Sequence, residues 1–117
     1  MIDRRKQVRQ QLVALTVVLD EASGEVLGQV GNLTIEGIMI CSDRPLEIDR
    51  LYALQIELPD EVDGRSRLNV LARSLWCQRA IIPTRYATGF ELLNVDDADR
   101  RVIQLLIQDA VFQRLTF

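Results

Sequence analysis

The chain has 117 residues, 48% of them hydrophobic and 26% charged, a composition typical of one globular domain rather than of a disordered segment. Its formal net charge is −3, but residues 1–10 carry +3, so the rest of the chain is acidic at −6. DNA and RNA are therefore not expected partners, because a protein that binds them needs a basic face.

The cysteines and the N-terminal residues indicate the compartment. Cys41 and Cys77 are far apart and follow no disulfide or zinc spacing, so both thiols are expected to be reduced and no metal site is expected. The N-terminus is charged where a signal peptide would be apolar, and no stretch approaches the roughly 20 apolar residues of a membrane helix. We therefore expect a cytoplasmic protein that does not insert into the membrane.

Five stretches with many Val, Leu and Ile residues predict β-strands. The second stretch counts as two strands, and Gly28, Gly31 and Gly37 interrupt it; glycines inside strands are typical of bulges or of close backbone approach. The pattern predicts an all-β fold, a small antiparallel barrel or sandwich. The stretches are 11–20, 26–41, 51–59, 67–78 and 86–95.

A polar connection follows the strand predicted at 51–59. It covers residues 60–66 and contains Asp63-Gly64, a dipeptide that favours the tight turns of β-hairpins. We therefore expect a hairpin with its tip at these two residues.

The last segment changes to a helical period, which predicts one helix over about 96–115. Asp96 is expected to cap this helix, and Asp97 and Asp99 favour its positive N-terminal end. The helix is expected to pack on the barrel or on a partner, and its face around Leu106 and Ala110 is a candidate homodimer surface. The apolar pairs that set the period are Val102/Ile103, Leu106/Ile107 and Ala110/Val111.

Catalytic chemistry has little support in the sequence. The chain contains no histidine, so the commonest general base and the commonest metal ligand are missing. It also contains no phosphate-binding loop, no dinucleotide-binding motif and no nucleophile elbow. We therefore expect a binding protein rather than an enzyme, with no catalytic residues, no bound metal and no cofactor.

Arginines near the N-terminus form the first candidate binding feature, Arg5-x-x-x-Arg9 with Arg4 directly before it. A guanidinium can bind a phosphate through two parallel hydrogen bonds, or bind O6 and N7 of guanine in the same way. Residues four apart point the same way in a strand and in a helix, so both side chains can reach one ligand. Taken alone, such a cluster is better explained as a basic tail that aids solubility.

The second candidate feature is Asn32-x-Thr34-x-x-Gly37. The Asn amide can match the hydrogen-bonding edge of guanine, the Thr hydroxyl can donate to an oxygen of the ligand, and Gly allows close approach to the backbone. Each residue also has an ordinary structural explanation, in a turn, a strand or a bulge.

Together, RRxxxR (4–9) and NxTxxG (32–37) resemble the paired motifs of the PilZ domain family, and the resemblance spans nearly the whole chain. It implies a six-stranded antiparallel β-barrel that binds the bacterial second messenger cyclic di-GMP and has no catalytic activity. In this resemblance Arg5 and Arg9 contact a phosphate and the guanine Hoogsteen edge, and the second motif completes the site, with Asn32 reading a guanine. Thr34 departs from the serine that is usual in the family, so weaker or altered binding is expected.

The resemblance also implies an organisation and a mechanism. Residues 11–117 would be a single PilZ-like barrel, and residues 1–10 are expected to be a flexible basic arm because they are terminal, polar and mutually repelling. The chain would be a stand-alone receptor that signals to an unidentified effector protein when the ligand orders the arm. The alternative is a PilZ-like interaction module that does not bind the nucleotide.

Arg4 and Trp76 add two further expectations. A third guanidinium beside the arginine pair favours an intercalated dimer of cyclic di-GMP, which carries four negative charges. Trp76 is expected to fill the barrel core, and is kept only as a candidate neighbour of the guanine site.

Overall fold

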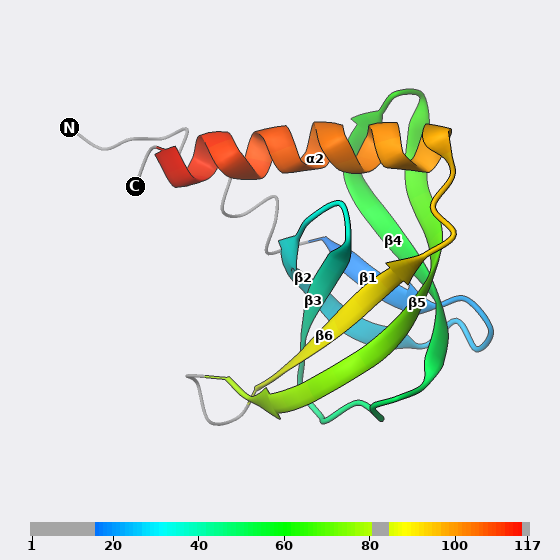
Figure 1. Cartoon of the computed structure of the whole chain (residues 1–117), viewed down its shortest axis with the longest axis vertical. Coiled ribbons are helices and arrows are strands. Elements are labelled where there is room, and N and C mark those ends of the chain that lie inside the picture. Colours follow the sequence, from blue (N-terminus) through cyan, green and yellow to red (C-terminus); the bar gives the residue numbers. More distant parts are fainter. Residues whose placement is uncertain (1–15, 81–84, 116–117) are drawn as a thin grey trace.

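The computed structural model describes residues 16–80 and 85–115, which form six strands and a helix (Figure 1). All six strand pairs are antiparallel, and they close a barrel in the order β1-β2-β3-β6-β5-β4. The predicted six-stranded antiparallel barrel with a C-terminal helix is therefore confirmed. The elements are β1 (Val17–Asp20), β2 (Val26–Leu33), β3 (Gly37–Ser42), β4 (Leu51–Val62), β5 (Arg65–Arg79), β6 (Tyr86–Leu93) and α2 (Asp97–Leu115).

Strict alternation along the strands builds the core. In β5, every second residue from Leu68 to Ser74 is buried and the residues between them are exposed, as expected for a strand with one face inside a barrel. The interior is filled mainly by branched aliphatic side chains, among them Ile40 and Leu54, which are fully buried. Val102 and Ile103 of α2 are also fully buried, so the helix closes one end of the barrel, across which it lies in Figure 1.

The β4–β5 connection is shorter than the predicted stretch 60–66. Only Asp63 and Gly64 lie between the two strands, and both have positive φ, 53° and 79°, as a two-residue hairpin turn requires. The predicted tip is confirmed, but the polar residues on either side of it continue the strands. The pairing register shifts between Glu57 and Val62, and this irregularity accommodates Pro59, which has no N–H to give to the ladder.

Strand β6 ends at Leu93, two residues before the predicted end at residue 95. Asn94 has φ 50°, in the left-handed region, and this conformation breaks the extended backbone. Asp96 then caps the helix as predicted: its Oδ1 accepts a hydrogen bond from the Asp99 N–H at 2.8 Å, and its carbonyl oxygen accepts one from the Arg100 N–H at 2.9 Å.

Asp96→Ala is expected to lower the free energy of unfolding by about 1 kcal/mol, because the Asp99 N–H loses its acceptor. Asp96→Asn is the matched control, since an amide oxygen caps about as well as a carboxylate. Denaturant unfolding followed by circular dichroism measures both variants. Equal losses in the two variants would show that charge, and not the capping hydrogen bond, stabilises this end of the helix.

Two ion pairs hold the first turns of α2 to the β4–β5 hairpin. Arg65 pairs with Asp99, and Arg101 Nε lies 3.1 Å from Asp63 Oδ2. The helix therefore has a fixed start above the barrel, while its C-terminal end extends past the barrel wall (Figure 1). Within the described residues, no helix is long and apolar enough to cross a membrane.

Candidate nucleotide-binding site

The NxTxxG motif forms the tight connection between β2 and β3. The Thr34 N–H donates to the Gly37 carbonyl oxygen at 2.8 Å, and the Gly37 N–H donates to Thr34 Oγ1 at 3.0 Å. A Cβ on Gly37 would lie 2.7 Å from the Phe90 carbonyl oxygen, so only glycine fits there without a shift of β6. Thr34 and Gly37 are thus brought together, and the threonine hydroxyl fixes the shape of the turn.

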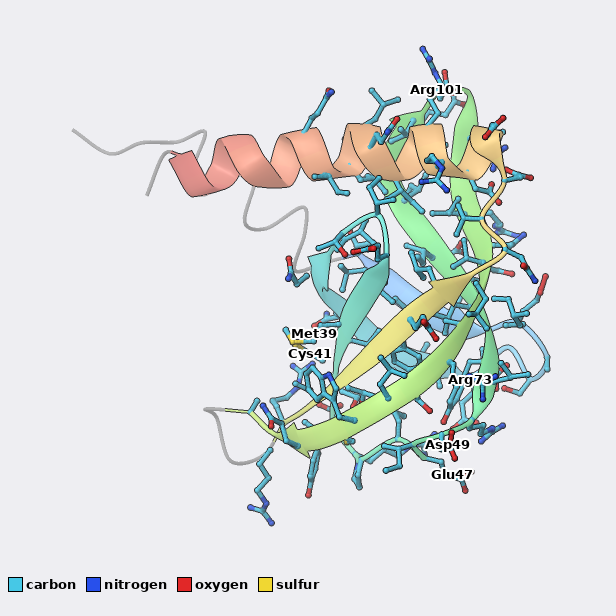
Figure 2. The ribbon with its side chains drawn as sticks, in the orientation of Figure 1. Met39, Cys41, Glu47, Asp49, Arg73 and Arg101 are labelled. Carbon is cyan, nitrogen blue, oxygen red and sulfur yellow. The ribbon has the colours of Figure 1, made fainter. Side chains whose placement is uncertain are left out.

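Asn32 is exposed near the end of β2, directly after a bulge. The pairing register shifts between Val30 and Asn32, which leaves Gly31 as the extra residue. A Cβ on Gly31 would lie 2.7 Å from the Met39 terminal methyl and 2.8 Å from Cys41 Sγ, so these two side chains cover Gly31. Figure 2 shows Met39 and Cys41 together on the outer side of β3.

Trp76 lies on the outer face of the barrel, and its predicted place in the core is wrong. Its exposed fraction is 41%. The reason is a register shift between Ser74 and Trp76, which makes Leu75 an extra residue and moves Trp76 to the opposite face from buried Ser74. The indole packs directly on Gly89, where a Cβ would lie 2.6 Å from Trp76 Cζ2.

Four paired residues, Asn32, Met39, Gly89 and Trp76, form a continuous row on the outer surface of the barrel. Asn32 pairs with Met39, Met39 with Gly89, and Gly89 with Trp76. The row joins β2, β3, β6 and β5, with the polar Asn32 at one end and the indole at the other. Such an arrangement suits a flat heterocycle, because an apolar surface can stack with its ring while an amide binds its edge.

The arginines Arg4, Arg5 and Arg9, and the arm 1–10 that contains them, lie outside the described residues. The described part nevertheless shows where the chain enters the barrel. The Val30 N–H donates to the Thr16 carbonyl oxygen at 2.9 Å, and β1 runs antiparallel to β2. Thr16, which directly precedes β1, therefore lies at the end of β2 that holds Asn32. Arg9 is seven residues before Thr16, a span of at most roughly 25 Å.

Comparison with protein families decides the relationship of the chain. Residues 3–109 match the family model of the PilZ domain. The chain belongs to the PilZ domain family. No curated protein sequence matches it.

Solved structures agree with this PilZ assignment. The inhibitor of motility MotI/DgrA of Bacillus subtilis superposes with a TM-score of 0.65 at 16% identity, covering 85% of this chain and 47% of MotI. The PilZ domain of YcgR from Escherichia coli, with c-di-GMP, superposes with a TM-score of 0.63 at 13% identity, covering 87% of both chains. PlzA of Borreliella burgdorferi, in complex with c-di-GMP, superposes with a TM-score of 0.56 at 9% identity, covering 92% of this chain and 49% of PlzA. The chain thus spans about half the length of MotI and of PlzA, and the likeness at these identities establishes the fold.

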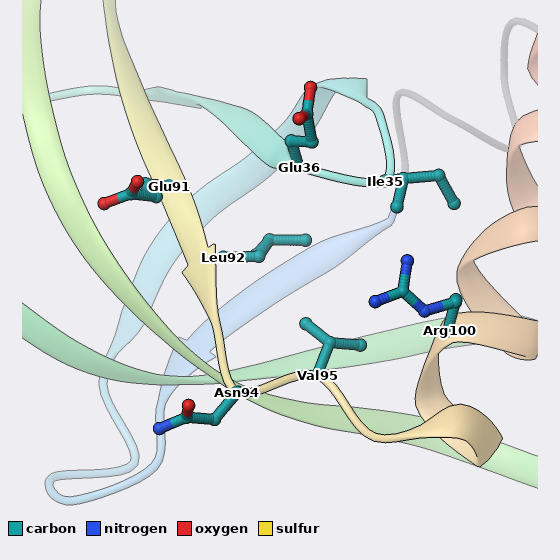
Figure 3. A pocket seen from close by; sticks show the side chains of 7 residues that line it. All are labelled: Ile35, Glu36, Glu91, Leu92, Asn94, Val95 and Arg100. Atoms are coloured by element: carbon teal, nitrogen blue, oxygen red, sulfur yellow. The ribbon is translucent and has the colours of Figure 1, made fainter.

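A pocket of about 640 Å³ lies beside the PilZ motif (Figure 3). The β2–β3 turn, the end of β6 and the first turn of α2 surround it. The Leu92 N–H donates to the Glu36 carbonyl oxygen at 2.9 Å and ties the turn to β6. The residues that line the pocket are Ile35, Glu36, Glu91, Leu92, Asn94, Val95 and Arg100.

Sequence reasoning did not predict this pocket. Its residues come from three separate segments, and only a knowledge of strand order brings them together. The one available sign was Ile35, an apolar residue inside an otherwise polar turn. In the described part of the chain, no group of three or more Cys, Asp or Glu side chains is arranged to hold a metal ion.

Proposed function

We propose that this PilZ domain is a receptor for cyclic di-GMP, bound by Arg5 and Arg9 together with Asn32, Thr34 and Gly37. The observation that carries the proposal is topological. Thr16, directly before β1, accepts a hydrogen bond from the Val30 N–H near the end of β2 that leads into the NxTxxG turn. Family membership and two similar folds bound to c-di-GMP support the choice of ligand.

The recognition chemistry follows from the outer row of side chains. Asn32 can bind the edge of one guanine, while the surface formed by Met39, Gly89 and Trp76 lies along the same face and can contact the base. The arginines bind phosphate and the O6/N7 edge. No bond of the ligand is made or broken, so the protein acts as a receptor and not as an enzyme.

Signalling in this proposal depends on the N-terminal arm. Binding draws residues 1–10 onto the barrel, and the covered surface is then read by an effector protein. Ordering about eight residues costs on the order of 8–16 kcal/mol if they start fully unfolded, and a few charge-assisted hydrogen bonds offset only part of this. We therefore expect micromolar affinity that falls steeply with salt.

Titration of the protein with cyclic di-GMP tests the proposal. Calorimetry gives the affinity, and the fluorescence of Trp76, the single tryptophan, gives an independent signal because the indole lies in the outer row. Cyclic di-AMP is the control, since adenine presents a different hydrogen-bonding pattern. No heat, no thermal shift and no fluorescence change with cyclic di-GMP would reject the receptor.

Arg4 sets the expected stoichiometry. We expect two molecules of cyclic di-GMP per chain, bound as an intercalated dimer, and one molecule in Arg4→Ala, because the larger ligand then loses a guanidinium. Lys6→Ala removes the same charge two positions away and should still bind two. Calorimetry that gives one ligand per chain in the unmodified protein, unchanged in Arg4→Ala, would contradict this expectation.

The second candidate is an interaction module that does not bind the nucleotide. One observation favours it: Leu51, Leu71 and Leu75 are exposed by 51%, 38% and 52% on β4 and β5, and a protein partner could cover them.

A homodimer through α2 is a further proposal, in which Leu105, 37% exposed, is available while Leu106 already packs partly against the core.

A further inference from the structure

The pocket beside the β2–β3 turn has an apolar floor and polar sides. Ile35, Leu92 and Val95 are partly buried against the barrel core and form the floor. In Figure 3, Glu36 and Arg100 lie on different sides of Leu92, and the Glu91 side chain points away from Arg100. The pocket is thus lined by two carboxylates, Glu36 and Glu91, and by one guanidinium, beside an apolar surface on which a flat ring can lie.

Arg100 is placed where a cation is unfavourable for stability. It is the fourth residue of α2, near the positive end of the helix dipole. Its neighbours Arg65 and Arg101 are paired with Asp99 and Asp63. Within the described residues, by contrast, the Arg100 guanidinium has no ion pair and no hydrogen bond. Arg100 is exposed, so its guanidinium beside the pocket is accessible to an external acceptor.

Guanine matches the Arg100 guanidinium and the Glu36 carboxylate on two of its edges. Its O6 and N7 accept the two parallel hydrogen bonds of a guanidinium, and its N1–H and 2-amino group donate to a carboxylate. Adenine would place an amino donor against the arginine and a bare nitrogen acceptor against the carboxylate. Enzymes that bind extruded bases also combine hydrogen bonds to the base edge with an apolar surface against the ring.

We propose that this pocket is a second guanine-reading subsite, in which Arg100 binds O6 and N7 and Glu36 binds N1–H and the 2-amino group. It rests on the proposed function, since the base is then a guanine of cyclic di-GMP other than the one read by Asn32. Glu36 lies between Thr34 and Gly37, so a single turn serves both subsites. Because Arg100 belongs to α2, the ligand also contacts the helix directly.

The test compares matched charge variants by calorimetry with cyclic di-GMP. Arg100→Ala is expected to weaken binding about 5- to 100-fold, the effect of losing one bidentate contact to guanine. Arg101→Ala removes the same charge from the next residue. The Arg101 guanidinium forms an ion pair with Asp63, so this variant should change the affinity less than 3-fold. Arg100→Lys keeps the charge but not the planar fork, and should also lose affinity.

An analogue identifies the carboxylate contact. Cyclic di-IMP lacks the 2-amino group, so it should bind the unmodified protein more weakly than cyclic di-GMP does. In Glu36→Gln this preference should shrink at least 3-fold, while Glu61→Gln, an exposed change on β4, should keep it. The methyl resonances of Ile35 and Leu92 should shift on addition of cyclic di-GMP.

The outcomes separate the two proposals. If the unmodified protein does not bind cyclic di-GMP, the receptor function fails and the subsite fails with it. If it binds, but Arg100→Ala behaves like Arg101→Ala and the Ile35 and Leu92 methyl signals stay in place, the subsite alone is overturned.

Discussion

Arg5→Ala is expected to weaken the binding of cyclic di-GMP about 30- to 1,000-fold. The guanidinium makes hydrogen bonds to a charged group of the ligand, and removing one partner of such a pair costs 2–5 kcal/mol when the other is left without its partner in the interface. Asn32→Ala is expected to act in the same direction but more weakly, since an amide contact is neutral. Calorimetry at fixed salt measures both variants.

Two controls distinguish a specific contact from general attraction. Lys6→Ala removes one positive charge next to Arg5, outside the RxxxR pattern. It should reduce affinity only by weakening the general electrostatic attraction to the ligand, which salt screens. Arg5→Lys keeps the charge but loses the bidentate geometry, and should resemble Arg5→Ala more than the unmodified protein. If Arg5→Ala and Lys6→Ala lose the same affinity, the arm attracts the ligand without a defined site, and the assignment of Arg5 is wrong.

The barrel was predictable where the information is local. Stretches rich in Val, Leu and Ile marked the strands, the Asp63-Gly64 pair marked a hairpin tip, where both residues have positive φ, and Asp96 marked the start of a helix. Each of these features depends on residues within a few positions of one another. The glycine-rich second stretch was also informative, since Gly31 is the extra residue at a bulge and a neighbouring backbone approaches Gly28 and Gly37.

The site was predictable only in part, because it depends on pairing between distant residues. The bulge at Leu75 puts Trp76 outside the barrel, but a bulge is a property of two strands and leaves no clear mark in one of them. The pocket with Glu36 and Arg100 likewise needs β6 to lie beside β3 and α2 to cross the barrel end. Resemblance of motifs supplied Asn32, Thr34 and Gly37, but no pattern in the sequence indicated Arg100.

Gly28→Ala is expected to cost more stability than Asp96→Ala, because the β3 backbone occupies the space that a Cβ at residue 28 would need. A Cβ at residue 28 would overlap the Cys41 carbonyl oxygen and lie 2.9 Å from the Cys41 carbonyl carbon and 3.0 Å from Ile40 Cγ2. The first two are backbone atoms of a paired strand, so they cannot rotate away as a flexible side chain would. Overpacking of this kind costs about 1–3 kcal/mol or more, which should lower the melting temperature by several degrees.

Gly24→Ala is the control for Gly28→Ala, and ligand binding is the second readout. A Cβ on Gly24 meets no atom within 4 Å, but φ there is +75°, so the change should cost only about 1 kcal/mol of backbone strain. Gly28→Ala should also weaken the binding of cyclic di-GMP, because a displaced Cys41 moves the Sγ atom that covers Gly31 beside Asn32. Equal melting temperatures for the two variants would show that β3 can move away from β2 without a loss of stability. The outer row that begins at Asn32 would then be more adaptable than its close packing indicates.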